Sequence, residues 1–557
     1  MSDYSLKTMR DNNQDASPDA TGAIDYDAQT ISAVLQLRLR APDTSSDEQW
    51  SQTFRMIAEN PGCCDEVWFS TGIGVPPIEW HEDNAARMAR AARQLRTIGV
   101  SFGIQIQATI GHADSISALE RTDGKAWGGW TGRDGTACRH CNCPRQPGFQ
   151  EYIRKMAECY AQCNPSSVWI DDDLRIFNHS PASPGAKAHE GWIGCWCDRC
   201  IADFNAETGG HWARETLDKA MTLDSDLFRQ WRDFSSRSVA AIAQIIAEAF
   251  QRISPQTMLA LQHGYRVDDS FTMMLRTLHE ISGRPVGSRP GGGQYYDVNP
   301  NDQIIKSLTA SRFRKEMGDP SWISVWTSEV ESCPRNYGSR SAQSIIVEAF
   351  SALMTGMNAA SMLVTHTGHE STELYSRTIL KPIADASPVL KGYAAACDGA
   401  FSAGFSSKIP VEALYAFAQT GIPVLFGVGR SYGELNDSDL KLNRCLATSV
   451  EVQRLRDELD ARAEGVAAVL ESPFVGLMVP HCTADGLLKT VALLNVRIDA
   501  QGPLVIRLRS IPSNVCHAVW HELRRPSMTL PVIFDGVLAR VVIPEISPWN
   551  GGYLDFC

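Results

Sequence analysis

Three consecutive aspartates, Asp171, Asp172 and Asp173, are the residues of this sequence best suited to chemistry. They follow residues 168–170, a short β-branched and aromatic run that is typical of a buried strand. Crowded carboxylates raise one another's pKa, so that one carboxyl can stay protonated near neutral pH and act as a general acid. The alternatives are an aspartate-rich turn that caps the next helix, or a set of ligands for a divalent cation in a metal-dependent enzyme.

Two glutamates, Glu329 and Glu331, close a second strand-like run at residues 322–331. Side chains alternate along a strand, so these two carboxylates point the same way. The pattern does not decide which of them is the reactive one. The alternative is a pair of helix-capping or salt-bridged acids.

A cluster of cysteines follows the aspartates. Cys195, Cys197 and Cys200 form a Cys-x-Cys-x-x-Cys pattern ahead of a helix. Three clustered thiols and one more from another loop make a closed tetrahedral zinc site, which is structural and not catalytic. The alternative is reduced cysteines without a metal. Spacing alone leaves open which residue of the preceding loop is the fourth ligand, and the candidates are Cys138, Cys141 and Cys143.

The elements that must position these residues alternate between strand and helix eight times over residues 28–397. This alternation predicts a (β/α)₈ barrel, whose active site lies at the carboxyl ends of its strands. Strands four and seven then carry the aspartates and the glutamates across the barrel mouth, an arrangement that glycoside hydrolysis needs. The expected strands are residues 31–40, 65–71, 100–110, 168–170, 257–264, 285–289, 322–331 and 359–366.

Three further segments flank the expected barrel. Residues 1–27 are polar and are expected to form a disordered leader. Residues 398–483 are expected to form a small α/β domain, with short strands at 411–417 and 422–428 and a helix at 450–470. Residues 484–557 are expected to form a β-sandwich. Its strands are predicted at 490–495, 504–508, 515–520, 532–534 and 537–543.

The composition bounds the function. The chain has 557 residues, 43% of them hydrophobic, and a net charge of −12, which argues against nucleic acid or an anionic membrane as a partner. No apolar run is long enough to span a membrane, and the first residues do not resemble a secretory signal. Sixteen scattered cysteines without such a signal favour a reduced, cytoplasmic protein.

Several motifs, taken in order, resemble the family-42 glycoside hydrolases, the bacterial β-galactosidases of clan A. Cys143-Pro144, a helix from Phe149, the three aspartates at the end of a strand and the Cys-x-Cys-x-x-Cys pattern follow one another as they do in that family. Glu331-Ser332-Cys333-Pro334 stands where the family has a Glu-Gln-x-Pro motif. The resemblance covers residues 30–400. A fainter resemblance is to trimeric β-mannosidases of the same architecture.

The resemblance implies roles for particular residues. Cys143 is the fourth ligand of a structural zinc ion, and Glu331 is the catalytic nucleophile. The acid/base glutamate of the family falls on Asp173, which is one methylene shorter, and the asparagine before it falls on Asp172. The family also forms trimers through its second domain, so a homo-oligomer, most simply a trimer, is expected here.

Taken together, the sequence predicts a retaining exo-β-glycosidase that acts on terminal β-linked hexosides of oligosaccharides or other glycosides. Asp173 would protonate the leaving oxygen, and Glu331 or Glu329 would attack the anomeric carbon. A carbohydrate-binding protein with little activity is the alternative. Further residues expected to contact the sugar are Asp172, Asp171, Arg38, His263, His366 and Trp326. Other candidates near the mouth are Trp68, Trp127, Trp130 and His369.

Overall fold

The computed structural model describes most of the chain after residue 33. The described residues are 34–107, 109–111, 122–176, 193–221, 225–264, 269–334, 336–368, 370–440, 448–463 and 465–556. The expected leader at 1–27 and His369 lie outside these ranges. Among the described residues, no helix is both long and apolar enough to cross a membrane.

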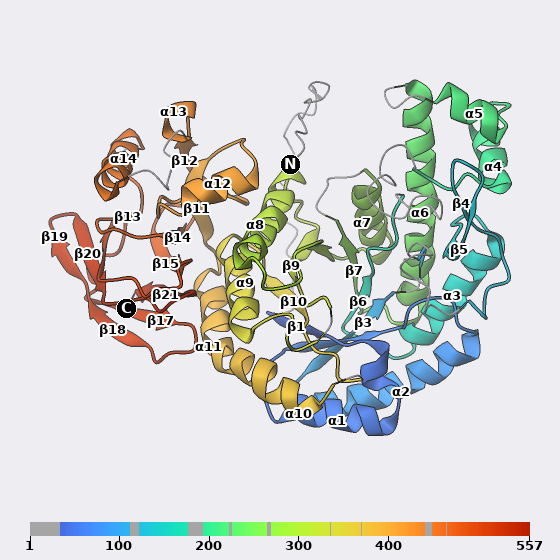
Figure 1. Ribbon diagram of the computed structural model, residues 1–557, viewed down its shortest axis with the longest axis horizontal. Coiled ribbons are helices and arrows are strands. Elements are labelled where there is room, and N and C mark those ends of the chain that lie inside the picture. The colour runs from blue at the N-terminus through green and yellow to red at the C-terminus, as the bar shows by residue number, and fades with distance from the viewer. Residues whose placement is uncertain are drawn as a thin grey trace. The chain divides into compact units, whose positions relative to one another are not determined.

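Eight parallel strands close into a barrel, which confirms the predicted fold (Figure 1). Their order around the barrel is β1-β10-β9-β8-β7-β6-β3-β2. The strands that carry the aspartates and the glutamates, β6 and β9, are therefore separated on one side by β7 and β8. The strand bounds are β1 Leu35–Arg38, β2 Glu66–Ser70, β3 Ser101–Ile106, β6 Ser167–Ile170, β7 Met258–His263, β8 Val286–Pro290, β9 Ile323–Glu331 and β10 Ala359–Leu363.

Amphipathic helices surround the barrel. In the first of them, α1, the Ser46 hydroxyl caps the helix by accepting a hydrogen bond from the Gln49 amide at 3.1 Å. Its buried side chains include Trp50 and Ile57, which pack toward the strands. The helices that follow strands are α1 Asp47–Ala58, α2 Ile78–Thr97, α3 Pro147–Ala161, α6 Asp226–Ile253, α7 Asp269–Ser282, α8 Pro300–Glu316, α9 Ala342–Met354, and the run α10 Thr372–Tyr375, η2 Ser376–Leu380 and α11 Lys381–Ala396.

Two tryptophans fill the barrel interior below its mouth. The rings of Trp68 and Trp169 stack with centroids 4.3 Å apart. Gly287 on β8 makes room for them, because a Cβ atom there would lie 2.8 Å from the Trp169 ring. The barrel is thus a packed core, and only its upper layer of side chains can meet a ligand.

Two long insertions lie on either side of the α3–β6 segment. The first, between β3 and α3, contains the hairpin β4 Gly129–Thr131 and β5 Ala137–Asn142. The second, between β6 and α6, contains the helices α4 Asp198–Thr208 and α5 Arg214–Ala220. These elements bring the loop before α3 next to the start of α4, where the two groups of cysteines meet.

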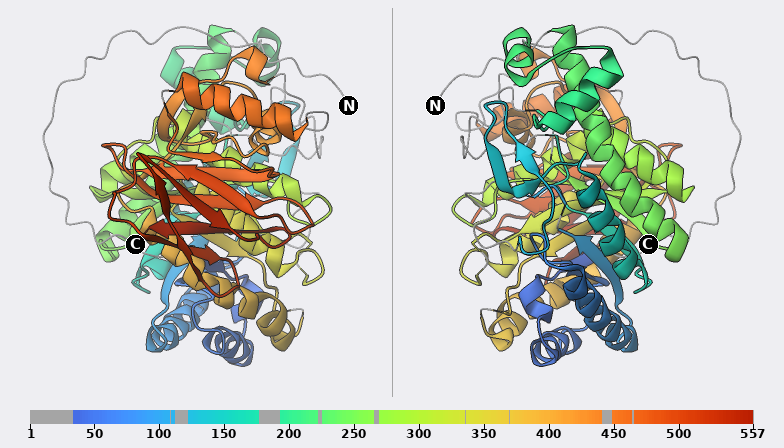
Figure 2. Two further views of the ribbon diagram at one scale, coloured as in Figure 1. Left: turned by 90° about the vertical axis from the view of Figure 1, so that its left-hand side faces the viewer. Right: turned by 90° about the vertical axis from the view of Figure 1, so that its right-hand side faces the viewer.

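The C-terminal region is built of two antiparallel-rich sheets that share an apolar core (Figure 2). Strands from both predicted segments, 398–483 and 484–557, pair within the larger sheet. Its order is β12 Gly429–Glu434, β11 Phe401–Ser406, β14 Gly476–Cys482, β15 Leu488–Asn495, β21 Asn550–Phe556, β17 His517–Glu522 and β18 Met528–Pro531. The smaller sheet runs β13 Ala468–Leu470, β16 Leu504–Leu508, β20 Leu538–Ile543 and β19 Ile533–Asp535.

Some local predictions in this region are wrong. Residues 411–417, expected to be a strand, lie in the helix α12 Val411–Ala418, because their buried side chains recur at helical spacing after Pro410. Residues 422–428 form only an isolated bridge to β11, and the regular strand is β12. The helix expected at 450–470 ends early, as α14 Ser449–Arg462, and is followed by β13. A short helix, α13 Asp437–Leu440, lies between β12 and α14.

The larger sheet packs against the barrel through β21. Its residue Gly551 lies against Phe350 of α9, where a Cβ atom would come within 2.8 Å of the ring. Gly392 of α11 similarly accommodates the hydroxyl of Tyr553. In Figure 1 these sheets, in orange and red, lie beside α9 and α11 and on the far side of them from the barrel strands.

Candidate active site

Two buried arginines organise the carboxylates at the barrel mouth. Arg38 is the last residue of β1, and Arg289 lies near the end of β8. Their residues are 3% and 1% exposed. Charges this deeply buried persist only when they are paired: Arg38 contacts both glutamates of β9, and Arg289 contacts Glu329.

Glu329 is held as an anion. Its Oε1 pairs with the Arg289 guanidinium, and its Oε2 accepts a hydrogen bond from the Gly292 amide at 2.8 Å. Burial alone would raise the pKa of Glu329, but the positive charges of Arg289, Lys306 and Arg38 outweigh it and hold the pKa below its usual value.

Gly291 makes this pairing possible. A Cβ atom at Gly291 would lie 2.3 Å from Nη1 of Arg289 and 2.9 Å from the Glu329 side chain. No larger residue fits at this position without moving the pair. The glycine run after β8 therefore has a steric role in the site.

Glu331 is the more accessible glutamate, with 7% of the residue exposed against 3% for Glu329. Its Oε2 lies 3.2 Å from Nη1 of Arg38, whose Nε donates to Gln105 at 3.2 Å. Its backbone carbonyl accepts a hydrogen bond from Arg340 at 3.2 Å. The alternation expected for a strand thus brings both glutamates to the same arginine.

The three aspartates have three different environments. Asp171 accepts a hydrogen bond from Gln105 at 2.7 Å. Asp172 has a side chain that is 28% exposed, and its Oδ2 lies 3.9 Å from Nη2 of Arg289. Asp173 is fully buried and points to the loop after β3.

The carboxyl group of Asp173 is committed to that loop. It accepts hydrogen bonds from the Thr109 hydroxyl, from the Thr109 amide at 3.3 Å and from the Gly111 amide at 2.8 Å. Burial, and then the charge of Asp171, raise the pKa of Asp173 well above its usual value. The sequence predicted Asp173 as the proton donor. In the structure, Asp172 is the aspartate that lies beside Arg289 of β8.

The reason for this difference is a turn. The Leu174 amide donates to the Asp171 carbonyl at 3.2 Å, so the chain leaves the strand directly after β6. Strand alternation no longer decides where Asp172 and Asp173 point. The Asp173 carboxyl bonds to Thr109 and Gly111, whereas Asp172 and Glu329 share Arg289.

Three residues of the site were missed in the sequence. Arg289 is the last residue of the strand expected at 285–289, and no role in the site is predicted for it. Tyr295, in the loop after β8, lies near the carboxylates: burial, and then the charges of Glu329, Glu331 and Asp172, raise its pKa. An arginine at the end of an expected strand, just before a Gly-Gly-Gly run, was the signal available for Arg289.

Gln262 is the third missed residue. It is fully buried on β7, beside Arg289 in the strand register, and neither of its amide atoms makes a hydrogen bond within the described part of the chain. A buried amide without partners is costly, and such groups are common where a ligand or an ordered water binds. A glutamine directly after the apolar run Met-Leu-Ala-Leu was the sequence signal.

Two of the predicted sugar contacts, His263 and Trp326, are fully buried against the helices around the barrel. His263 is fully buried, and its ring nitrogens bond to the Gly264 carbonyl and the Ser288 hydroxyl, both at 2.8 Å. Burial lowers its pKa to about 4, so its ring is neutral at neutral pH. Trp326 is also fully buried and packs against Phe313 of α8. Both side chains lie on the outer, helix-facing side of the barrel, because they alternate along their strands with the side chains that face the interior.

The remaining candidates lie in varied places. His366 follows β10 and is half-buried. Trp68 belongs to the barrel core, and Trp130 is buried in the insertion. Trp127 is partly exposed, and its ring nitrogen donates to Asn142 at 2.9 Å.

Four cysteines come together as predicted from the motif order. The sulfur atoms of Cys143, Cys195, Cys197 and Cys200 all lie within 4.8 Å of one another. The Cys143 sulfur is 3.6 Å from that of Cys197 and 3.4 Å from that of Cys200. Four sulfurs at 2.3 Å from one zinc ion are about 3.8 Å apart, so this set has suitable geometry. Cys138 and Cys141 are buried nearby but do not belong to the group.

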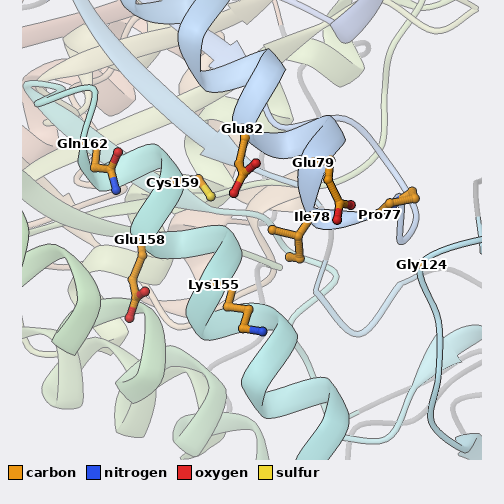
Figure 3. Close-up of a pocket in the computed structure, with 9 residues that line it drawn as sticks. All are labelled: Pro77, Ile78, Glu79, Glu82, Gly124, Lys155, Glu158, Cys159 and Gln162. Atoms are coloured by element: carbon orange, nitrogen blue, oxygen red, sulfur yellow. The ribbon is translucent and has the colours of Figure 1, made fainter.

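A surface hollow of about 660 Å³ lies away from the barrel mouth, between α2 and α3 (Figure 3). Glu79 and Glu82 project into it from α2, and Lys155, Glu158 and Cys159 from α3. None of the residues predicted to do chemistry lines it.

Comparison with known proteins supports the fold. No protein-family model matches the sequence, and no curated protein matches it either. Among solved structures, α-L-fucosidase isoenzyme 2 from Paenibacillus thiaminolyticus aligns with a TM-score of 0.59 and 11% identity, over 94% of this chain and 100% of that one. The cold-adapted β-galactosidase from Rahnella sp. R3 aligns with a TM-score of 0.48 and 11% identity, over 92% and 99%. The alignment with the fucosidase shows that the two chains share a fold from the barrel to the C-terminal sheets.

Proposed function

We propose that this protein is a glycoside hydrolase that removes terminal β-linked hexoses with retention of configuration. One observation carries the proposal: Arg289 contacts both Asp172 after β6 and Glu329 on β9, so carboxylates from two walls meet at one place in the mouth. Two carboxyl groups that flank one bond are what most glycosidases require. The motif resemblance around Glu331 supports the same reaction.

Glu331 is the nucleophile in this proposal. It is the more exposed of the two glutamates, and its carboxylate faces Arg38. Both oxygens of Glu329 are instead engaged, by Arg289 and the Gly292 amide. Glu329 thus fixes Arg289, which in turn contacts Asp172.

Asp172 takes the acid/base role that the resemblance assigns to Asp173. A proton donor must reach the leaving oxygen, and the Asp172 side chain is 28% exposed, whereas Asp173 is fully buried. Gln262 lies beside Arg289 in the strand register, Tyr295 lies near the carboxylates, and both would bind sugar hydroxyls.

The reaction then has two displacements. In the first, a Glu331 carboxylate oxygen bonds to the anomeric carbon, the bond to the leaving oxygen breaks, and the Asp172 proton moves to that oxygen. In the second, Asp172 takes a proton from water as the water oxygen bonds to the anomeric carbon and Glu331 is released.

A panel of 4-nitrophenyl glycosides tests this proposal. It should include β-galactoside and β-mannoside, and also α-L-fucoside because a fucosidase shares the fold. Proton NMR of the first-formed sugar should show the configuration of the substrate. A product of inverted configuration would contradict a covalent intermediate. A protein that turns over no glycoside of the panel would favour the carbohydrate-binding alternative.

The four cysteines would hold a structural zinc ion, with Cys143 as the fourth ligand. Their mutual distances suit tetrahedral coordination, and a closed set of thiolates leaves no position for a substrate. Such a site stays metallated where thiols stay reduced, which fits a cytoplasmic location. Elemental analysis should find one zinc per chain, and chelation should lower stability more than it changes the rate per folded molecule.

A homotrimer belongs to the same proposal. Large apolar side chains are exposed on the loops after β8 and β9: Tyr296 is 48% exposed, Val298 85% and Tyr337 49%. A neighbouring subunit that helps to wall the mouth would cover them. Light scattering at micromolar concentration should report three chains, and a monomer would contradict this part of the proposal.

A further inference from the structure

A buried ionic cluster lies directly behind the end of β9. It consists of Arg340, Glu348 of α9, Lys306 of α8 and Asp297 from the loop after β8. The side chains of Arg340 and Glu348 are both 0% exposed, and that of Lys306 is 1% exposed. Asp297, whose side chain is 28% exposed, supplies the second negative charge, so that two positive and two negative charges balance.

Glu348 is the centre of the cluster. One of its oxygens lies 2.5 Å from Nη1 of Arg340, and the other lies 2.9 Å from Nζ of Lys306. Arg340 is further held by Gln303 at 2.5 Å and Ser344 at 3.3 Å, and its Nε lies 3.6 Å from Asp297. Contacts from α8, α9 and the loop after β8 thus leave the guanidinium one orientation.

The same guanidinium binds the backbone of Glu331. Nη1 of Arg340 donates to the Glu331 carbonyl at 3.2 Å. Glu331 is the last residue of β9, so its carbonyl lies where the strand ladder ends. A charged donor from a fixed side chain takes the place of the next strand hydrogen bond.

We propose that Arg340 is a positioning residue: by holding the Glu331 carbonyl against α8 and α9, it sets the place from which the Glu331 carboxylate attacks the sugar. This inference rests on the proposed function and adds a residue whose contact with Glu331 is through the backbone carbonyl and not through the reacting carboxylate. Lys306 acts in parallel on the second glutamate, since its charge helps to keep Glu329 ionised.

Placement of a nucleophile has a measurable effect on rate. A displacement of about 1 Å can cost about 100-fold in the chemical step, even when binding is unchanged. A residue with a purely structural role would instead lower the free energy of unfolding and leave the rate of each folded molecule unaltered.

The test uses a probe that reports nucleophilic attack alone. 2,4-Dinitrophenyl 2-deoxy-2-fluoro-β-galactoside forms a slowly hydrolysed glycosyl-enzyme, and the inactivation rate constant and its half-saturation concentration are measured separately. Arg340→Lys keeps the charge but not the planar fork. It should lower the rate constant about 10- to 100-fold with unchanged half-saturation.

Arg456→Lys is the matched control. Arg456 is also a buried arginine that donates to backbone carbonyls, those of Thr420, Leu470 and Ser472, but it lies in the C-terminal region. It should lower stability without changing the inactivation rate constant. Glu348→Gln, which frees Arg340 without removing it, should lower the rate constant in the same direction if Arg340→Lys folds poorly.

The outcomes separate the two proposals. If the wild type is labelled and the variants Arg340→Lys, Glu348→Gln and Arg456→Lys all keep its inactivation rate constant, the positioning role of Arg340 is overturned. The proposed function then still stands. Mass spectrometry that finds the label on Glu329 overturns the positioning role too, and moves the nucleophile. A wild type that neither reacts with this fluoroglycoside nor hydrolyses any glycoside of the panel overturns the proposed function, and the inference with it.

Discussion

The carboxylates on β6 and those on β9 reach the barrel mouth in different ways. Glu329 and Glu331 lie within a regular strand, two residues apart, and both face Arg38. The aspartates begin where β6 has already ended, and their side chains contact three different partners: Gln105, Arg289 and the loop after β3. Residues inside a strand inherit their direction from the backbone, whereas residues in the following turn take it from whichever hydrogen bonds the turn permits.

The largest expected effect is on Glu331. Glu331→Ala should lower kcat about 10⁴-fold or more for every substrate, because no other group forms the glycosyl-enzyme. Added azide should restore part of the rate as an external nucleophile. If Glu331→Ala stays active while Glu329→Ala does not, the nucleophile lies two residues earlier on the same face of β9.

The next effect separates two of the aspartates. Asp172→Ala should slow substrates with poor leaving groups about 10²- to 10⁴-fold and activated aryl glycosides much less, since only the former need protonation. Asp173→Ala should instead lose about 1–3 kcal/mol of unfolding free energy, because the Thr109 and Gly111 donors are left unpaired. Leaving-group dependence in Asp173→Ala and not in Asp172→Ala would restore the assignment drawn from the resemblance.

A smaller effect is expected at Gln262. Gln262→Leu should lower kcat/KM about tenfold, the equivalent of one neutral hydrogen bond to a sugar hydroxyl. Its unfolding free energy should not fall, because the amide has no partner to lose in the described structure. A loss of stability with unchanged kcat/KM would instead identify an ordered internal water as the partner of Gln262.

The smallest effect is a change in pH dependence. The folded-state pKa of Asp173 is raised, so its carboxyl stabilises the fold fully below the unfolded pKa, near 3.9, and this stabilisation is lost as pH rises through the folded pKa. Asp173→Asn cannot ionise, so the variant should not lose this stabilisation as pH rises. Denaturant unfolding across this pH range should therefore give a flatter slope for the variant, and parallel curves would mean that Asp173 is ionised in the folded protein.

The barrel was predictable because its strands and helices differ clearly in hydrophobic period. The glutamate pair was predictable for the same reason, and the four thiols followed from motif order. Arg289 and Gln262 were missed because each is a single polar residue in a short buried strand, whose role depends on neighbours far away in sequence. The helix α12 was missed because a short apolar run fits a strand as well as a helix.

The position of β21 has a consequence for how the chain folds during synthesis. β21 pairs with β15 on one side and β17 on the other, so it joins the strands β12, β11, β14 and β15 to β17 and β18. All of those strands leave the ribosome before residues 550–556 do. Until then the sheet exists as two separate halves with unpaired edges, and its contact with α9 and α11 cannot form. Any delay before this segment emerges therefore prolongs the time for which those unpaired edges are exposed.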